Sequence, residues 1–104
     1  MSEPIIVIAR FTPLEGCQEE LIEGLRRTVP AIHDEPGCLL YSVHRGVDGT
    51  VVQIEKWESR ELLDRHSGAE PVAALKRAIS PFLANQQLTV LEAVPIGDSA
   101  KAAI

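Results

Sequence analysis

Aromatic side chains are scarce in this chain of 104 residues, which contains one Trp, one Tyr and two Phe. A hydrophobic core must therefore consist mainly of Ile, Leu and Val. The 45% hydrophobic content, with 24% charged residues, is ordinary for a globular protein and argues against global disorder. The length suits one domain and is too short for two. We expect a single domain over residues 1–96 and a flexible tail over residues 97–104.

Basic clusters and long apolar runs are missing as well. The formal net charge is −5, and the longest basic run is Arg26-Arg27. Nucleic acid is excluded as a partner, because its phosphates require a basic face. No apolar run approaches the roughly 20 residues that span a bilayer. Residues 1–4 lack the basic segment that begins a signal peptide. The sequence therefore predicts a cytoplasmic protein with no membrane partner.

Cysteine is limited to Cys17 and Cys38, which form no C-x-x-C pair and have no His or Cys at metal-ligand spacing. In a reducing compartment we expect two free thiols rather than a disulfide. No Gly-rich nucleotide motif is present either. The sequence predicts neither a metal site nor a bound cofactor.

The first half of the chain contains a strand and a helix. The segment of residues 5–11 begins with apolar side chains at both odd and even positions, which is typical of a strand buried on both faces. Residues 12–16 break this strand pattern. A helical stripe follows from Cys17, through Leu21, Leu25, Val29 and Ile32. Pro30 removes a backbone donor, so we expect a bent last turn or an early end of this helix. Residues 35–37 close the segment.

Strands and short helices share the second half. Residues 39–45 and 51–57 predict two strands joined by the Asp48-Gly49 hairpin signal. Ser59 is a good N-cap for a short helix that ends near His66. The remaining expected elements are a helix that begins at Glu70-Pro71 and carries Val72, Leu75, Ile79 and Phe82, and a strand at residues 88–94.

The resulting order is β-α-β-β-α-β with the second helix split, which predicts a ferredoxin-like α+β fold with an antiparallel sheet. Both helices of such a fold cover one face of the sheet. The first strand is apolar on both parities, so the other face also needs a cover. A second copy of the chain is the simplest cover, and we expect a homodimer.

Two motifs carry a resemblance to a known family. Residues 35–38 read E-P-G-C and lead into Tyr41, and residues 55–59 read E-K-W-E-S and are followed by His66. Correctly placed at the start of strand two and the end of strand three, they resemble the antibiotic biosynthesis monooxygenase family, with similarity from about Ile5 to Glu92. The resemblance implies a dimeric α+β barrel. It also implies one of three chemistries: cofactor-free oxidation of anthrones or quinols to quinones, isomerisation of small phosphorylated dicarbonyls, or haem degradation.

Haem degradation is the least similar branch, since Ala9 stands where its Asn is expected and Lys76 stands where its iron-ligating His is expected. An ammonium is a poor iron ligand compared with imidazole. The anthrone-oxidising branch is more similar, because its Trp aligns with Trp57 and its Arg aligns with Arg77. Its acid-Pro pair aligns with residues 70–71.

This chain departs from the branch patterns at three positions. The Asn of the anthrone branch falls at Gln53, and its Tyr falls at Leu63, which has no hydroxyl to relay a proton. In the quinol-oxidising branch a His matches His66, but a second His falls at Pro71. The resemblance thus implies a class of reaction and leaves the substrate open.

An electron-rich hydroxyaromatic can reduce O₂ itself once it is deprotonated, so no flavin or metal is required. The resemblance then implies roles for five residues. His66 would be the base, since imidazole titrates near neutrality. Trp57 would stack on the substrate ring, Gln53 would hydrogen-bond a carbonyl or hydroxyl, and Arg77 would stabilise the anion. Tyr41 would add a polar contact.

Structural interpretations of the same residues remain open. Trp57 could serve only as core, His66 could be solvated at a helix end, and Gln53 could be an amide of a dimer interface. Arg77 lies off the apolar stripe, so a surface salt bridge is an alternative. A non-oxidative isomerase or a ligand-binding dimer is the alternative function. A phosphorylated dicarbonyl needs at least two converging cations, for which Arg10, Lys56 and Arg77 are the candidates.

Overall fold

Eight elements follow one another along the computed structural model, which describes residues 3–104. They are β1 (Ile5–Pro13), α1 (Gln18–His33), β2 (Cys38–Arg45), β3 (Val51–Trp57), α2 (Arg60–Ser67), α3 (Glu70–Ile79), a 3₁₀ turn (Ser80–Phe82) and β4 (Leu83–Glu92). This order confirms the ferredoxin-like α+β fold with a split second helix.

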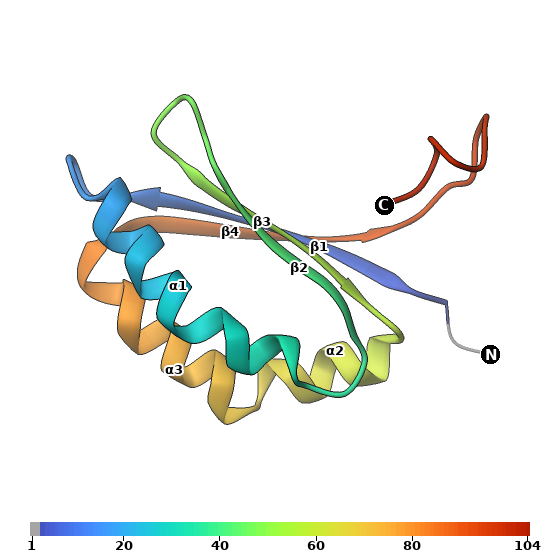
Figure 1. The fold of residues 1–104 in the computed structure, drawn as a ribbon, viewed down its shortest axis with the longest axis horizontal. Coiled ribbons are helices and arrows are strands. Elements are labelled where there is room, and N and C mark those ends of the chain that lie inside the picture. The colour runs from blue at the N-terminus through green and yellow to red at the C-terminus, as the bar shows by residue number, and fades with distance from the viewer. Residues whose placement is uncertain (1–2) are drawn as a thin grey trace.

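The sheet is antiparallel with strand order β2-β3-β1-β4, and the three helices lie on one of its faces (Figure 1). Residues directly opposite each other in an antiparallel pair share a face. Val7 lies opposite Glu55, and Ala9 lies opposite Gln53. Because side chains alternate along a strand, Trp57 points to the same face. Glu55 and Trp57 of the second motif therefore point toward the helices, as does Gln53.

Several boundaries differ from the sequence-based expectation. Strand β1 runs to Pro13 instead of breaking at residue 12, and α3 ends at Ile79, so Phe82 lies in the 3₁₀ turn. Helix α1 continues through Pro30 to His33. Proline costs about 3 kcal/mol or more inside a helix, but Val29 and Ile32 are both buried beside it, and each such burial contributes about 1.5–3 kcal/mol. The last strand begins at Leu83, not at residue 88, and ends at Glu92, because it pairs with the whole of β1.

The core lies between the helices and the sheet. The largest fully buried side chains are Trp57, Leu21, Leu25, Ile32, Ile79, Gln53 and Val51. Gly24 allows α1 and α3 to approach, since a Cβ there would lie 2.9 Å from the main-chain oxygen of Ala78. Cys17 and Cys38 are free thiols, as predicted. No helix within residues 3–104 is long and apolar enough to cross a membrane.

The other face of the sheet carries no helix (Figure 1). Ile6 is buried on this face, Ile8 is half-buried and Arg10 is exposed. Lys56 donates a hydrogen bond from Nζ to the main-chain oxygen of Ile104 (2.8 Å), so the end of the tail returns to this part of the sheet.

Candidate functional site

A pocket of about 170 Å³ lies between the helix-facing side of the sheet and helices α2 and α3. Its apolar wall comes from β1, through Val7, Ala9 and Phe11, and from Leu63 and Leu75 of the helices. Its polar groups include Tyr41, Gln53, Glu55 and His66. The pocket therefore combines an apolar surface for a ring with a small number of polar groups, which is typical of small-molecule sites.

His66 is the buried imidazole of this pocket. The Ser59 side chain accepts a hydrogen bond from the main-chain N–H of Leu62 (3.2 Å), which confirms the predicted N-cap of α2. His66 is only 5% exposed and contacts a Glu35 oxygen through Nδ1 at 2.7 Å. Since an ionised carboxylate only accepts, neutral His66 carries its proton on Nδ1. This is the only hydrogen bond of the ring within the described residues, and it leaves Nε2 available to a molecule in the pocket.

Trp57 lies behind this imidazole. Its ring is fully buried and stacks on His66, with centroids 4.4 Å apart and 30° between the planes. Its Nε1–H donates to Glu55 Oε1 at 3.0 Å. Burial raises the pKa of the Glu55 carboxyl, and the hydrogen bond from Trp57 opposes that rise. Glu55 is therefore a buried carboxyl on the pocket wall with a raised pKa.

Tyr41 and Gln53 form a second polar pair. Gln53 Nε2 donates to the Tyr41 hydroxyl at 3.0 Å. Burial raises the pKa of Tyr41 well above its usual range, so the phenol stays protonated. Gln53 is 1% exposed, and its Oε1 has no hydrogen-bond partner within residues 3–104. A buried acceptor without a partner costs about 1–3 kcal/mol, and a ligand hydroxyl could satisfy it.

The sequence of this chain matches one known protein family over most of its length. The model described as "Antibiotic biosynthesis monooxygenase" matches residues 4–78. The chain belongs to the antibiotic biosynthesis monooxygenase family. Rv0793 of Mycobacterium tuberculosis, which bears the provisional name of a monooxygenase, is 34% identical over 70 residues, or 66% of this chain and 69% of that protein.

Several solved structures of similar chain length have the same fold. PA3566 from Pseudomonas aeruginosa is 30% identical, with a TM-score of 0.80 and coverage of 90% of this chain and 97% of that one. The structure of Rv0793 gives 28% identity and a TM-score of 0.79, with 93% and 99% covered. SnoaB, described as a cofactor-independent oxygenase from Streptomyces nogalater, has 18% identity, a TM-score of 0.78 and coverage of 89% and 95%, a likeness of fold alone.

The residues that the family resemblance singled out do not all line the pocket. Tyr41, Gln53, Leu63 and His66 line it. Trp57 does not line it but contacts two residues that do, His66 and Glu55. Arg77 lies outside the pocket, where its Nη2 pairs with Glu70 Oε1 at 2.6 Å and both side chains are exposed.

Three charged residues of the site were not predicted from the sequence. Glu35 and Glu55 belong to the two family motifs, but no role was assigned to them. Glu55 carried a usable signal, since it lies on the same strand parity as the buried Gln53 and Trp57. Lys76 lines the pocket and lies four residues after Val72, so the helical repeat places both on one side of α3.

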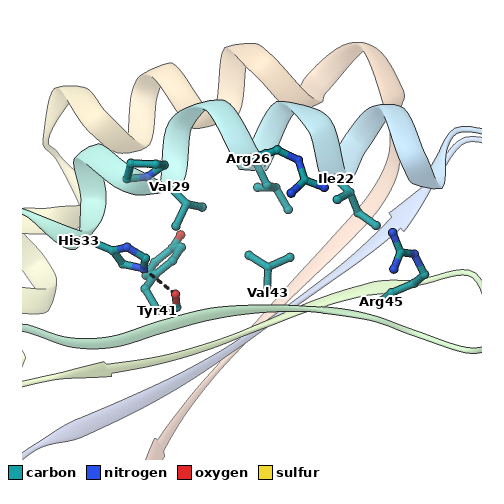
Figure 2. Close-up of a pocket in the computed structure, with 9 residues that line it drawn as sticks. Ile22, Arg26, Val29, His33, Tyr41, Val43 and Arg45 are labelled. Atoms are coloured by element: carbon teal, nitrogen blue, oxygen red, sulfur yellow. Dashed lines mark hydrogen bonds between the residues drawn. The ribbon is translucent and has the colours of Figure 1, made fainter.

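A larger groove of about 390 Å³ lies between α1 and β2 (Figure 2). Ile22 and Val29 point from α1 toward Tyr41 and Val43 of β2, and His33 Nε2 contacts the main-chain oxygen of Tyr41 at 2.8 Å. Its two arginines are already paired, Arg26 with Glu23 at 3.0 Å and Arg45 with Glu19 at 2.9 Å. The groove thus lacks the unsatisfied buried polar atom that marks the pocket at Gln53. Within residues 3–104, no three His, Cys, Asp or Glu side chains gather as a metal site.

Proposed function

We propose that this chain is a cofactor-independent monooxygenase that uses O₂ to oxidise a quinol, an anthrone or a similar hydroxyaromatic to a quinone. One oxygen atom enters the substrate and the other leaves as water, so an anthrone becomes a quinone and a quinol becomes a hydroxyquinone. The substrate supplies all four electrons. The observation that carries the proposal is the buried imidazole of His66 in the same apolar pocket as the unpartnered oxygen of Gln53. The first group can take a hydroxyl proton, and the second can hold a hydroxyl in place.

His66 is the base in this proposal. Its Nε2 removes a hydroxyl proton, and the resulting electron-rich anion transfers electrons to O₂. Proton transfer by a positioned group of this kind contributes typically about 10²–10⁴-fold. Trp57 and Glu35 hold the imidazole in place through stacking and through Nδ1. Because Trp57 is fully buried, it would act through His66 rather than on the substrate ring.

Tyr41, Gln53 and Leu63 bind the substrate. Gln53 accepts from a substrate hydroxyl through Oε1, and the protonated Tyr41 hydroxyl can donate to a developing oxyanion. Leu63 packs against the ring. Lys76, and not Arg77, stabilises the substrate anion in this proposal. Lys76 lines the pocket, whereas the Arg77 guanidinium is paired with Glu70.

The placement of cations supports the oxygenase over an isomerase of a phosphorylated dicarbonyl. The side chains of Arg10 and Lys56 lie on the face of the sheet that points away from the helices. Arg77 is paired with Glu70. Among the described residues, Lys76 is thus the one Lys or Arg that lines the pocket, where a phosphate calls for at least two.

The volume of the pocket limits the size of the substrate that it can hold. The volume is about 170 Å³, close to that of an engineered apolar cavity of roughly 150 Å³ that binds benzene. One aromatic ring fits within it, and a fused system would extend through the mouth, where Leu88 is 60% exposed. We therefore rank single-ring quinols above tricyclic anthrones.

A homodimer is part of the proposal. The helix-free face of the sheet carries the half-buried apolar side chains Ile8, Leu40, Val52 and Ile54. A second copy would remove this apolar surface from water. Sedimentation at micromolar concentration should show a dimer, and a monomer would leave this face without its proposed cover.

Oxygen uptake by the purified protein, treated with chelator, tests the function. Single-ring quinols and anthrones form the panel, and we expect enzyme-dependent uptake without release of H₂O₂ and no flavin or haem absorption band. Each O₂ should give one hydroxyquinone from a quinol, or one quinone from an anthrone. His66→Ala should lower kcat at least tenfold, whereas His44→Ala, an exposed histidine on β2, should leave kcat unchanged. Uptake at the spontaneous rate across the panel would refute the oxygenase proposal.

A further inference from the structure

Glu35 is held in place by the turn between α1 and β2. Its main-chain N–H donates to Ile32 and its main-chain oxygen accepts from Cys38, at 3.0 and 3.3 Å. Two residues on, Gly37 has a φ of +84°, and a Cβ there would lie 2.5 Å from Leu62 Cδ1 of α2. The turn therefore fits closely against α2, the helix that carries His66.

The contact between Glu35 and His66 joins two buried side chains. They are 11% and 5% exposed, and the Nδ1–Oε2 distance is 2.7 Å. A charge-assisted hydrogen bond of this length is among the stronger ones in proteins. It fixes the ring orientation and the tautomer, as a carboxylate partner commonly does for a functional histidine.

His66 also lines a second pocket of about 240 Å³, which Glu35 shares. Pro36 and Arg65, both exposed, form part of its wall, so this pocket opens to solvent. Among the described residues, His66 is the one that lines both this surface pocket and the substrate pocket. His66 thus lies between the substrate pocket and a surface pocket that it shares with its carboxylate partner, Glu35.

We propose that Glu35 positions His66 and forms the solvent end of its proton path, an inference that rests on the proposed role of His66 as base. When Nε2 takes a proton from the substrate hydroxyl, the Nδ1 proton passes to Glu35 Oε2 and on to water in the surface pocket. The imidazole is then neutral with its proton on Nε2. That proton goes to the reduced oxygen that leaves as water, and Glu35 returns a solvent proton to Nδ1. The turnover therefore consumes no net proton.

The first test reads the His66 tautomer by ¹⁵N NMR of the intact protein without substrate. Wild type should show the proton on Nδ1, and Glu35→Ala should move population to the Nε2–H form. Glu35→Gln should show a smaller shift, since its amide oxygen can still accept from Nδ1–H. Asp34→Ala, an exposed acid one residue earlier in the same turn, should leave the wild-type tautomer. An unchanged tautomer in both Glu35 variants overturns the proposal, whether or not a substrate has been found.

The second test is chemical rescue of Glu35→Ala, with folding verified by circular dichroism. Loss of the carboxylate should lower kcat by about 10–100-fold, the range seen for residues that orient a functional histidine, with KM changed less than about twofold. Formate, which fits the vacated surface pocket, should restore at least tenfold, while neutral formamide should not. Equal rescue by both, or rescue by neither, overturns the proton path. If the wild-type protein is inactive on the whole quinol panel, the oxygenase proposal is refuted instead. The tautomer measurement alone then decides whether Glu35 positions His66.

Discussion

Gln53→Leu separates a functional amide from a structural one. Gln53 is 1% exposed, donates one hydrogen bond to Tyr41 at 3.0 Å and leaves Oε1 without a partner among residues 3–104. Leucine has a similar size and no polar atom, so it removes both the bond and the unsatisfied oxygen. The two changes act in opposite directions on stability.

Their magnitudes nearly cancel. A buried unpaired acceptor costs about 1–3 kcal/mol, and loss of the Gln53 amide leaves the buried Tyr41 hydroxyl without its partner, at a similar cost. The expected free energy of unfolding stays within about 1 kcal/mol of wild type, and Tm changes by no more than about 4–8 °C for a domain near this size. Substrate binding should weaken at least fivefold, because the substrate hydroxyl loses its acceptor.

Thermal unfolding and quinol turnover are the paired assays. Gln18→Leu is the matched control, since Gln18 Nε2 donates to the main-chain oxygens of Gly46 and Thr50, at 3.1 and 2.9 Å, and has a structural role. It should lower stability by about 1–2 kcal/mol and leave kcat unchanged. If Gln53→Leu also lowers stability by more than about 1 kcal/mol, with turnover intact, then the Gln53 amide is structural and the reasoning fails.

Three other changes probe the site from different directions. Burial raises the pKa of Glu55 above its reference value of 4.5, so its contribution to stability falls as pH rises through the folded-state pKa. Glu55→Gln should therefore stabilise the protein more at pH 7.5 than at pH 4, as measured by urea unfolding. An equal effect at both pH values would contradict the raised pKa of this carboxyl. Gly37→Ala combines a left-handed φ with a clash against Leu62 and should cost about 2–4 kcal/mol in the same assay; a smaller loss would mean that the turn yields easily. Lys76→Met should raise KM for quinols that bear a carboxylate more than for their esters, and Arg77→Met should not; the reverse result would restore the role of Arg77 implied by the family resemblance.

Periodicity predicts most of this fold because local spacing and burial agree. The α1 stripe through Leu21, Leu25 and Ile32 is fully buried, and the odd residues of β3 face the helices. Prediction fails where pairing overrides the local pattern. Residues 84–87 are polar or small and give no strand signal, yet they form the start of β4 because β1 offers them a partner.

The site is less predictable, because its central contact joins distant positions. Tyr41, Gln53 and His66 follow from motifs and strand parity. The partner of His66 is Glu35, 31 residues earlier, and nothing in either local pattern specifies that they meet. Lys76 and Arg77 differ by one residue on α3, and a rotation of 100° decides which of them reaches the pocket.

The proposed chemistry and the proposed association lie on opposite faces of one sheet. Every wall of the substrate pocket comes from the helix-facing side, including Tyr41, Gln53 and His66, and the surface pocket at Glu35 lies at the same side. The apolar face proposed for a second copy carries side chains of the other parity, such as Ile8 and Ile54. Because strand alternation separates the two sets, substitutions on the outer face can alter association without touching a pocket residue. The proposed base, its carboxylate partner and the substrate-binding amide thus form a set within a single chain.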